Sequence, residues 1–120
     1  MHELGLCEDI VAAIEQRAGE RPVARVRVRV GRLHHVHEDA FAQSFALAAA
    51  GGVADGADAE LVLLPVQAHC GGCGADSQAN ELISACLSCG SFDIELTGGD
   101  ELILESIEYR PTTVTADRIG

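Results

Sequence analysis

Two Cys-x-x-Cys pairs constrain the fold of this chain more than any other feature. Cys70 and Cys73 form the first pair, twelve residues follow, and Cys86 and Cys89 form the second. Two residues between cysteines let both thiolates reach one metal ion, so two pairs supply a tetrahedral shell of four sulfurs. A glycine after each pair lets the backbone fold back, so that its amide hydrogens point toward sulfur. The sequence therefore predicts a metal-binding knuckle.

Zinc suits this sulfur shell because it is borderline soft and imposes no competing geometry. Iron in a rubredoxin-like arrangement fits the same four sulfurs. If no metal binds, the four cysteines form two disulfides or remain free thiols. The fifth cysteine, Cys7, lies on an apolar helical stripe, where we expect a small buried thiol. Four cysteines in metal spacing and one left over favour a reducing cytosol.

The charge of the chain narrows the class of partner. The 120 residues carry a formal net charge of −11, and four metal-bound thiolates make it more negative still. Such a surface repels a phosphate backbone and argues against nucleic acid, but it is compatible with a basic protein partner or with the handling of cations. The N-terminus lacks the basic and apolar regions of a secretory signal, and no stretch approaches the about 18 apolar residues of a membrane span.

Hydrophobic spacing predicts an α+β fold. Helical periods alternate with strand periods, and Gly19 and Gly51-Gly52 end the two helices. The expected elements are a helix at 4–18, a second helix that starts near Glu38 and stops at Gly51-Gly52, and strands at 23–30, 60–66 and 101–109, with a shorter extended segment at 93–96. We expect two helices on one face of a small mixed sheet, with an inserted zinc-knuckle, ribbon-like module.

The insertion point predicts two domains. Residues 1–66 and 100–120 form one expected α/β domain, and residues 67–99 form the expected zinc-binding domain. Because one strand precedes the insert and another follows it, we expect the knuckle to extend from adjacent strands over two short hinges. Pro65 cannot donate to a sheet ladder and marks an edge or the exit toward the knuckle.

The strand at 23–30 alternates valine and arginine. Val26, Val28 and Val30 occupy one face, and Arg25, Arg27 and Arg29 occupy the other. We expect the arginines to lie on the solvent face with carboxylates nearby; docking of an acidic partner is the alternative.

The first three residues, Met1-His2-Glu3, form a second candidate metal site. The α-amine, the backbone nitrogen of His2 and its imidazole can close successive five- and six-membered chelate rings. A fourth position is open to the amide or the carboxylate of Glu3. These donors suit square-planar Ni(II) or Cu(II), and binding should weaken as pH falls because protons must leave the amine and amide.

Three histidines precede the second helix, at His34, His35 and His37. Alternate residues of an extended loop project to one side and can hold a metal. We favour a solvated loop for His34 and His35, and we keep His37, beside Glu38 and Asp39, as a candidate ligand.

The order of these features resembles one family. The chain begins Met-His-Glu-Leu and enters an amphipathic helix, and a valine-rich strand ending at Gly31 leads to a helix with Phe41 and Phe45. The two Cys-x-x-Cys pairs follow, and then a strand containing Ser106-Ile107-Glu108. This order, over residues 1–109, resembles the HypA/HybF family of hydrogenase nickel-incorporation proteins.

The resemblance implies a metallochaperone and not an enzyme. It implies that Met1, His2 and Glu3 bind Ni(II) transiently, and that Cys70, Cys73, Cys86 and Cys89 hold structural Zn(II). It further implies that the protein delivers nickel to the large subunit of [NiFe]-hydrogenase, with the GTPase HypB as partner. In some organisms, members of the family also deliver nickel to urease. A homodimer with swapped helices is left open. The chain departs from the family in having His69 directly before Cys70 and Leu87 where proline is common.

Three functions are ranked with the family resemblance taken into account. No acid, nucleophile and orienting group stand together as an enzyme requires. A nickel metallochaperone ranks first, a zinc-ribbon interaction adaptor without nickel second, and a rubredoxin-like iron electron carrier third.

Overall fold

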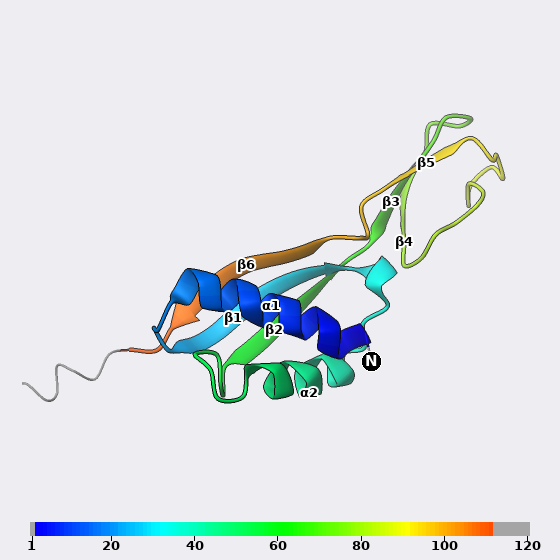
Figure 1. Ribbon diagram of the computed structural model, residues 1–120. Helices are drawn as coiled ribbons and strands as arrows, with labels where there is room; N and C mark the ends of the chain where they lie inside the picture. Colours follow the sequence, from blue (N-terminus) through cyan, green and yellow to red (C-terminus); the bar gives the residue numbers. More distant parts are fainter. Residues whose placement is uncertain (1, 112–120) are drawn as a thin grey trace, which may run out of the picture.

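The computed structural model describes residues 2–111, and Met1 lies outside them. Two helices, six strands and one short 3-10 turn make up this part of the chain (Figure 1). Neither helix combines the length and the apolar character that a membrane span needs. In chain order the elements are α1 (His2–Ala18), β1 (Val23–Gly31), the 3-10 turn η1 (Arg32–His34), α2 (Glu38–Ala49), β2 (Asp58–Leu64), β3 (Val66–Cys70), β4 (Asp76–Ala79), β5 (Ile94–Thr97) and β6 (Leu102–Tyr109).

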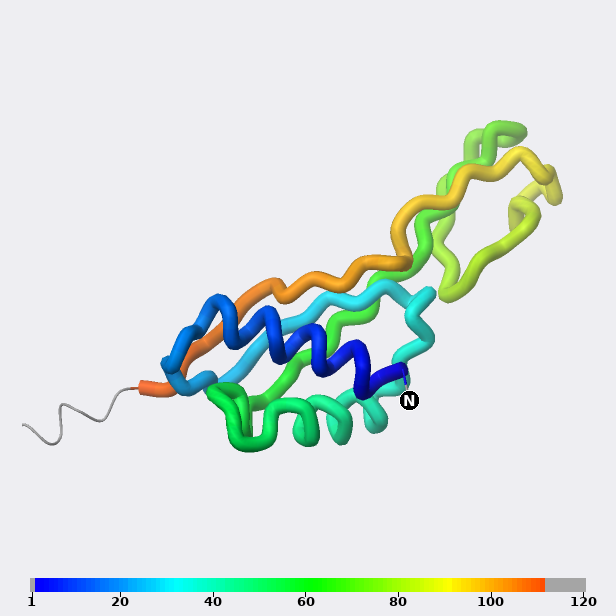
Figure 2. The backbone as a smooth tube through the Cα atoms, viewed as in Figure 1, coloured from blue at the N-terminus to red at the C-terminus, as the bar shows by residue number. Residues whose placement is uncertain are grey.

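The larger sheet is mixed and has the order β2-β1-β6. Strand β1 pairs in parallel with β2 and antiparallel with β6, so Val28 faces Leu61 on one side and Leu104 on the other. Both helices cover one face of this sheet (Figure 2). The buried residues between the layers are mainly aliphatic, with Phe41 and Phe45 stacked on α2 at 6.4 Å between ring centroids. The predicted α+β fold, with two helices on a small mixed sheet, is confirmed.

The valine and arginine faces of β1 separate as predicted. The valines are buried against the helices, and the arginines lie on the uncovered face beside two carboxylates. Glu60 of β2 lies 2.9 Å from Arg25 and 3.1 Å from Arg27, and Glu105 of β6 lies 3.5 Å from Arg27 and 3.3 Å from Arg29. The predicted solvent face with local carboxylates is therefore confirmed. Exposed ion pairs of this kind add little stability, so burial of the valine face holds β1 in place.

Strand β6 contains a bulge that explains its irregular sequence pattern. Arg27 pairs with Ser106 and the next residue, Val28, pairs with Leu104, so Glu105 is the extra residue. The bulge lets Leu104 and Ile107, three positions apart, both pack on the core. It also directs Glu105 to the arginines of β1. A strictly alternating strand would place one of the two apolar side chains in water.

The smaller sheet has the order β4-β3-β5 and projects beyond one end of the larger one (Figure 1). We call residues 66–97, which contain this sheet and both cysteine pairs, the knuckle unit. Pro65 lies between β2 and β3, so it marks the exit toward the knuckle as predicted. The expected adjacency of the strands flanking the insert is wrong, because β1 lies between β2 and β6. The short strand β4 was also not anticipated.

A backbone contact joins the two sheets. The N–H of Gly31 donates to the carbonyl of Glu101 at 2.8 Å, and the N–H of Leu33 donates to the carbonyl of Gly99 at 2.8 Å. Gly31 lies so close to Gly99 that a Cβ on Gly31 would overlap the carbonyl group of Gly99. Gly99 itself has a φ of +89°, which only glycine adopts without strain. Glycine is therefore required on both sides of this joint.

Substitution of Gly31 by alanine should lower the free energy of unfolding by at least about 1–3 kcal/mol, because the new methyl meets fixed backbone. Urea unfolding followed by circular dichroism measures this. Gly5→Ala is the matched control, since nothing lies within 4 Å of that position in α1, and alanine there should stabilise by about 0.5–1 kcal/mol. An unchanged unfolding midpoint in Gly31→Ala would contradict the close contact.

Candidate metal centre

The four predicted cysteines converge at the tip of the knuckle unit. Their sulfur atoms all lie within 4.8 Å of one another. Two sulfur–sulfur distances, Cys70 to Cys89 and Cys73 to Cys86, are each 3.7 Å. Four sulfurs at the usual zinc–sulfur distance form a tetrahedron with edges of roughly 3.8 Å. The donor set and its spacing therefore fit a tetrahedral zinc ion.

The two pairs are built as repeated turns. The N–H of Gly74 donates to the carbonyl of Cys70 at 2.8 Å, and the N–H of Gly90 donates to the carbonyl of Cys86 at 2.9 Å. Both glycines have positive φ values, 78° and 79°. The N–H of Cys73 donates to the sulfur of Cys70 at 3.4 Å, as folding back of the backbone requires. Each turn thus stabilises negative charge on its first sulfur.

The cluster favours some thiolates and opposes others. Hydrogen bonds from the N–H groups of Cys89 and Ser88 lower the pKa of Cys86 to about 6. The backbone of Ser91 favours the thiolate of Cys89, but the neighbouring sulfurs of Cys73 and Cys70 outweigh it and raise the pKa of Cys89 to about 12. Four adjacent negative charges therefore need a cation among them. A divalent metal supplies that charge, and its binding must release protons.

His69, which directly precedes Cys70, does not join the cluster. Successive side chains of β3 point to opposite faces, so Cys70 is buried and His69 is exposed. The Nδ1 atom of His69 lies 2.7 Å from the carboxylate of Asp76 on β4, and this hydrogen bond and its charge raise the pKa of His69. His69 is thus held on the sheet surface by Asp76.

The described residues of the N-terminal candidate site are helical. The sequence predicted a helix from residue 4, but α1 begins at His2, so His2 and Glu3 form its first turn and are not an extended end. An acidic side chain favours the positive end of the helix dipole, and Glu3 supplies one there. The imidazole of His2 is exposed, and its Nδ1 lies 3.4 Å from Glu3 Oε1. Met1 lies outside the described residues.

Glu3 is the connection between this helical turn and the histidine loop. Its side chain is buried, and its Oε2 accepts a hydrogen bond from the backbone N–H of His37 at 3.4 Å. Burial opposes ionisation of Glu3, but the N–H groups of Glu3 and His37 and the charge of His2 outweigh it and lower the pKa of Glu3. A carboxylate thus fixes the first turn of α1 against the start of α2.

The remaining thiol and the histidines do not form a third cluster. Cys7 is fully buried, its sulfur lies 3.6 Å from the carbonyl of Phe41, and burial together with the charge of Glu3 raises its pKa to about 11. The predicted small buried thiol is confirmed. His34 Nε2 lies 2.9 Å from the carbonyl of Asp100, at the joint between the sheets. Within residues 2–111, the four cysteines are the one group of three or more His, Cys, Asp or Glu side chains with metal spacing.

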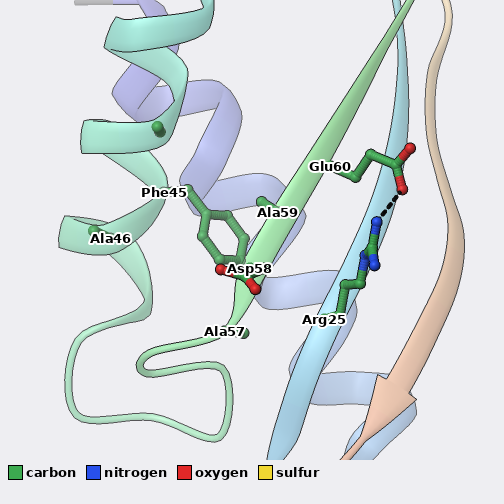
Figure 3. A pocket seen from close by; sticks show the side chains of 8 residues that line it. Arg25, Phe45, Ala46, Ala57, Asp58, Ala59 and Glu60 are labelled. Carbon is green, nitrogen blue, oxygen red and sulfur yellow. Dashed lines mark hydrogen bonds and ion pairs between the residues drawn. The ribbon is translucent and has the colours of Figure 1, made fainter.

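The larger of the two best-formed cavities, about 530 Å³, lies between α2 and β2 (Figure 3). Phe45 points from α2 toward β2, and the ion pair of Arg25 with Glu60 lies on the far side of β2. The other lining residues are Ala42, Ala46, Ala57, Asp58 and Ala59. The polar side chains of this lining are Arg25, Asp58 and Glu60.

Two contacts at the candidate sites could not be found from the sequence. The bond from His37 to Glu3 joins residues 34 positions apart, and the bond from His34 to Asp100 joins residues 66 positions apart. Neither pair has a local motif, so only the packing of α1 on α2 and of β1 beside β6 reveals them.

Comparisons with known proteins agree over most of the chain. The family model described as hydrogenase/urease nickel incorporation, metallochaperone, hypA matches residues 1–109. The hydrogenase maturation factor HypA of Alkalilimnicola ehrlichii is 39% identical over 111 residues, covering 90% of this chain and 98% of that protein. HypA 2 of Bradyrhizobium diazoefficiens is 35% identical with the same coverage. The solution structure of the Ni metallochaperone HypA from Helicobacter pylori is similar in fold, with a TM-score of 0.60 and 24% identity, covering 89% of this chain and 96% of that one.

Cys7 should react slowly with alkylating reagents in the zinc-loaded protein. Only the thiolate attacks iodoacetamide, and burial together with the charge of Glu3 raises the pKa of Cys7 to about 11, so its labelling should stay low at neutral pH and rise only as the pH approaches that value. Peptide mass spectrometry after short exposures at each pH measures the rate. Rapid labelling of Cys7 at neutral pH would contradict its burial between α1 and α2.

Proposed function

The chain belongs to the HypA family of hydrogenase and urease nickel-incorporation metallochaperones, and on this premise we propose that it binds Ni(II) at its N-terminus and delivers it to maturing [NiFe]-hydrogenase. Met1, His2 and Glu3 would hold the nickel, with the α-amine of Met1 as one donor. Cys70, Cys73, Cys86 and Cys89 would hold a structural zinc ion.

The helical start of α1 supports the nickel assignment. The first four N–H groups of an α-helix have no acceptor within the helix. The amide nitrogen of His2 can therefore release its proton to the solvent and bind nickel in its place without breaking a helical hydrogen bond. The exposed imidazole of His2 can close the second chelate ring, and Glu3 is held beside it. A site of so few ligands at a chain end should release its cargo readily, as a delivery protein needs.

The sulfur geometry carries the zinc assignment. Two sulfur–sulfur distances of 3.7 Å match the edges of a zinc tetrahedron, and all four positions would be filled by protein. A closed site of this kind is structural, because no position is left for exchange or for substrate. Zinc would supply one divalent charge to the four thiolates and would leave the nickel site as the place where cargo is exchanged.

The organisation and partners of the chain follow from this division. We propose residues 1–66 with 100–120 as the nickel-binding domain and residues 67–99 as the zinc-binding domain. The GTPase HypB and the large subunit of [NiFe]-hydrogenase are the proposed protein partners. Urease is a further proposed recipient of the nickel, and the proposed assembly is a homodimer. The contact between Gly31 and Gly99 would transmit strain between the two domains.

Nickel titration of the zinc-loaded protein tests the N-terminal site. The wild type should bind one nickel tightly per chain, and His2→Ala should lose it while retaining zinc, because the substitution removes the imidazole donor. His35→Ala is the control, since this exposed histidine of the loop should leave nickel binding unchanged. Calorimetry with absorption spectroscopy measures both. Equal nickel binding by wild type and His2→Ala would remove the N-terminal site.

Zinc content tests the four-sulfur site independently. Cys73→Ser should lose stoichiometric zinc and unfold the knuckle unit, because metal affinity contributes directly to its folding. Cys7→Ala should keep the zinc although it loosens the packing of α1 on α2. Metal analysis after dialysis against a competing chelator measures the difference. Loss of zinc from both variants, or from neither, would refute the assignment.

A further inference from the structure

The knuckle unit carries large apolar side chains that no part of the described chain covers. Phe92 is 83% exposed, Leu87 is 72% exposed, and Leu82 is 67% exposed. All three lie in the segment that contains the second cysteine pair. Burying a side chain of this size is favourable, so three exposed within eleven residues indicate a binding surface.

The second cysteine pair orders the backbone next to Leu87 and Phe92. The N–H of Cys86 donates to the carbonyl of Ser91 at 2.8 Å, which brings the residue before Leu87 beside the residue before Phe92. The N–H of Gly90 donates to the carbonyl of Cys86 inside the same turn. The backbone beneath both side chains is therefore fixed before any partner arrives. A preorganised apolar anchor loses little conformational entropy on binding.

Acidic residues predominate in the knuckle unit, where His69, bonded to Asp76, is the one basic side chain. The chain has no lysine or arginine between Arg32 and Arg110. The knuckle unit instead contains Asp76, Glu81, Asp93 and Glu95, and two of these adjoin Leu82 and Phe92 in sequence. Four thiolates around one zinc ion would add two further negative charges. The complementary surface is an apolar pocket bordered by lysine and arginine.

The position of the turn relative to α1 limits which partner it serves. His2 begins α1 at the end of the helix layer that lies nearer the knuckle unit (Figure 1). The Gly31–Gly99 contact and the bond from His34 to Asp100 fix the knuckle unit to that end of the larger sheet. A protein bound to the turn is therefore held on the side of the molecule where nickel would leave.

We propose that Leu87 and Phe92 form a docking surface for the protein that receives nickel, through an apolar pocket bordered by basic residues on that protein. The inference rests on the proposed nickel delivery and names the surface that recognises its recipient. The recipient is the precursor of the [NiFe]-hydrogenase large subunit. Phe92 is the central anchor, Leu87 fills the pocket beside it, and the acidic residues of the knuckle unit orient the approach.

Binding of the purified large-subunit precursor from the same organism to the full-length, zinc-loaded chain tests this surface. The double variant Leu87→Ser, Phe92→Ser should bind at least about tenfold more weakly, because aromatic anchors dominate interface energetics. Leu47→Ser on α2 is the matched control, since Leu47 is 70% exposed and lies outside the knuckle unit. Binding of the wild type should weaken as sodium chloride is raised, and Glu81→Gln should reduce that dependence.

Zinc and nickel contents of the same samples separate this inference from the proposed function. One zinc per chain in the double variant shows that the knuckle is folded, and unchanged nickel binding shows that the cargo site is intact. Weakened precursor binding under those conditions supports the docking surface. Equal affinity of wild type and double variant, equal loss in Leu47→Ser, or no binding by the wild type would overturn it while nickel binding stands.

Discussion

The repulsion among four closely spaced sulfurs is the constraint on which the knuckle unit depends. The smaller sheet buries only Val66, Ala68 and Cys70, all on its central strand, so it has almost no apolar core of its own. Its fold must come from the cysteine turns, and those turns bring together thiols that cannot all ionise without a cation. A divalent metal would therefore complete both the charge and the folding of this unit.

The larger sheet is held together in a different way. Its core is a continuous layer of valine, isoleucine, leucine and phenylalanine between one sheet face and two helices, which needs no metal. This separation suits a carrier of metal cargo. Metal in the knuckle can stabilise structure permanently, while the first turn of α1 rests on a core that remains folded whether or not cargo is bound.

The joint between the sheets connects the four-cysteine cluster to the first turn of α1. Gly31 ends the valine strand, and Gly99 lies in the connection between β5 and β6, so their close contact lies between the core and the knuckle. The histidine loop starts next to the same place and reaches Glu3 through the N–H of His37. A chain of contacts therefore runs from the first turn of α1, through the carboxylate of Glu3, to the base of the knuckle.

Local spacing in the sequence predicted both helices, the strands of the larger sheet and the grouping of four cysteines, but not strands β3 and β4. The two Cys-x-x-Cys pairs, the valine–arginine alternation and the helical stripes each follow from the geometry of one short segment, so they were predicted without any tertiary information. The convergence of the four sulfurs also follows from the spacing, because two residues between the cysteines of a pair let both thiolates reach one metal ion. Two helices on a mixed sheet followed from the order of these elements.

Long-range pairing was decided only in the folded chain. Strand β1 lies between β2 and β6, although the strands flanking the insert were expected to be neighbours, because burying both edges of the valine strand outweighs any preference for short connections. The bulge at Glu105, the carboxylate partners of the arginines and the burial of Glu3 against His37 depend on the same pairing. Sequence spacing fixes how a segment repeats along its own axis, but which segments meet depends on the shape of the whole core.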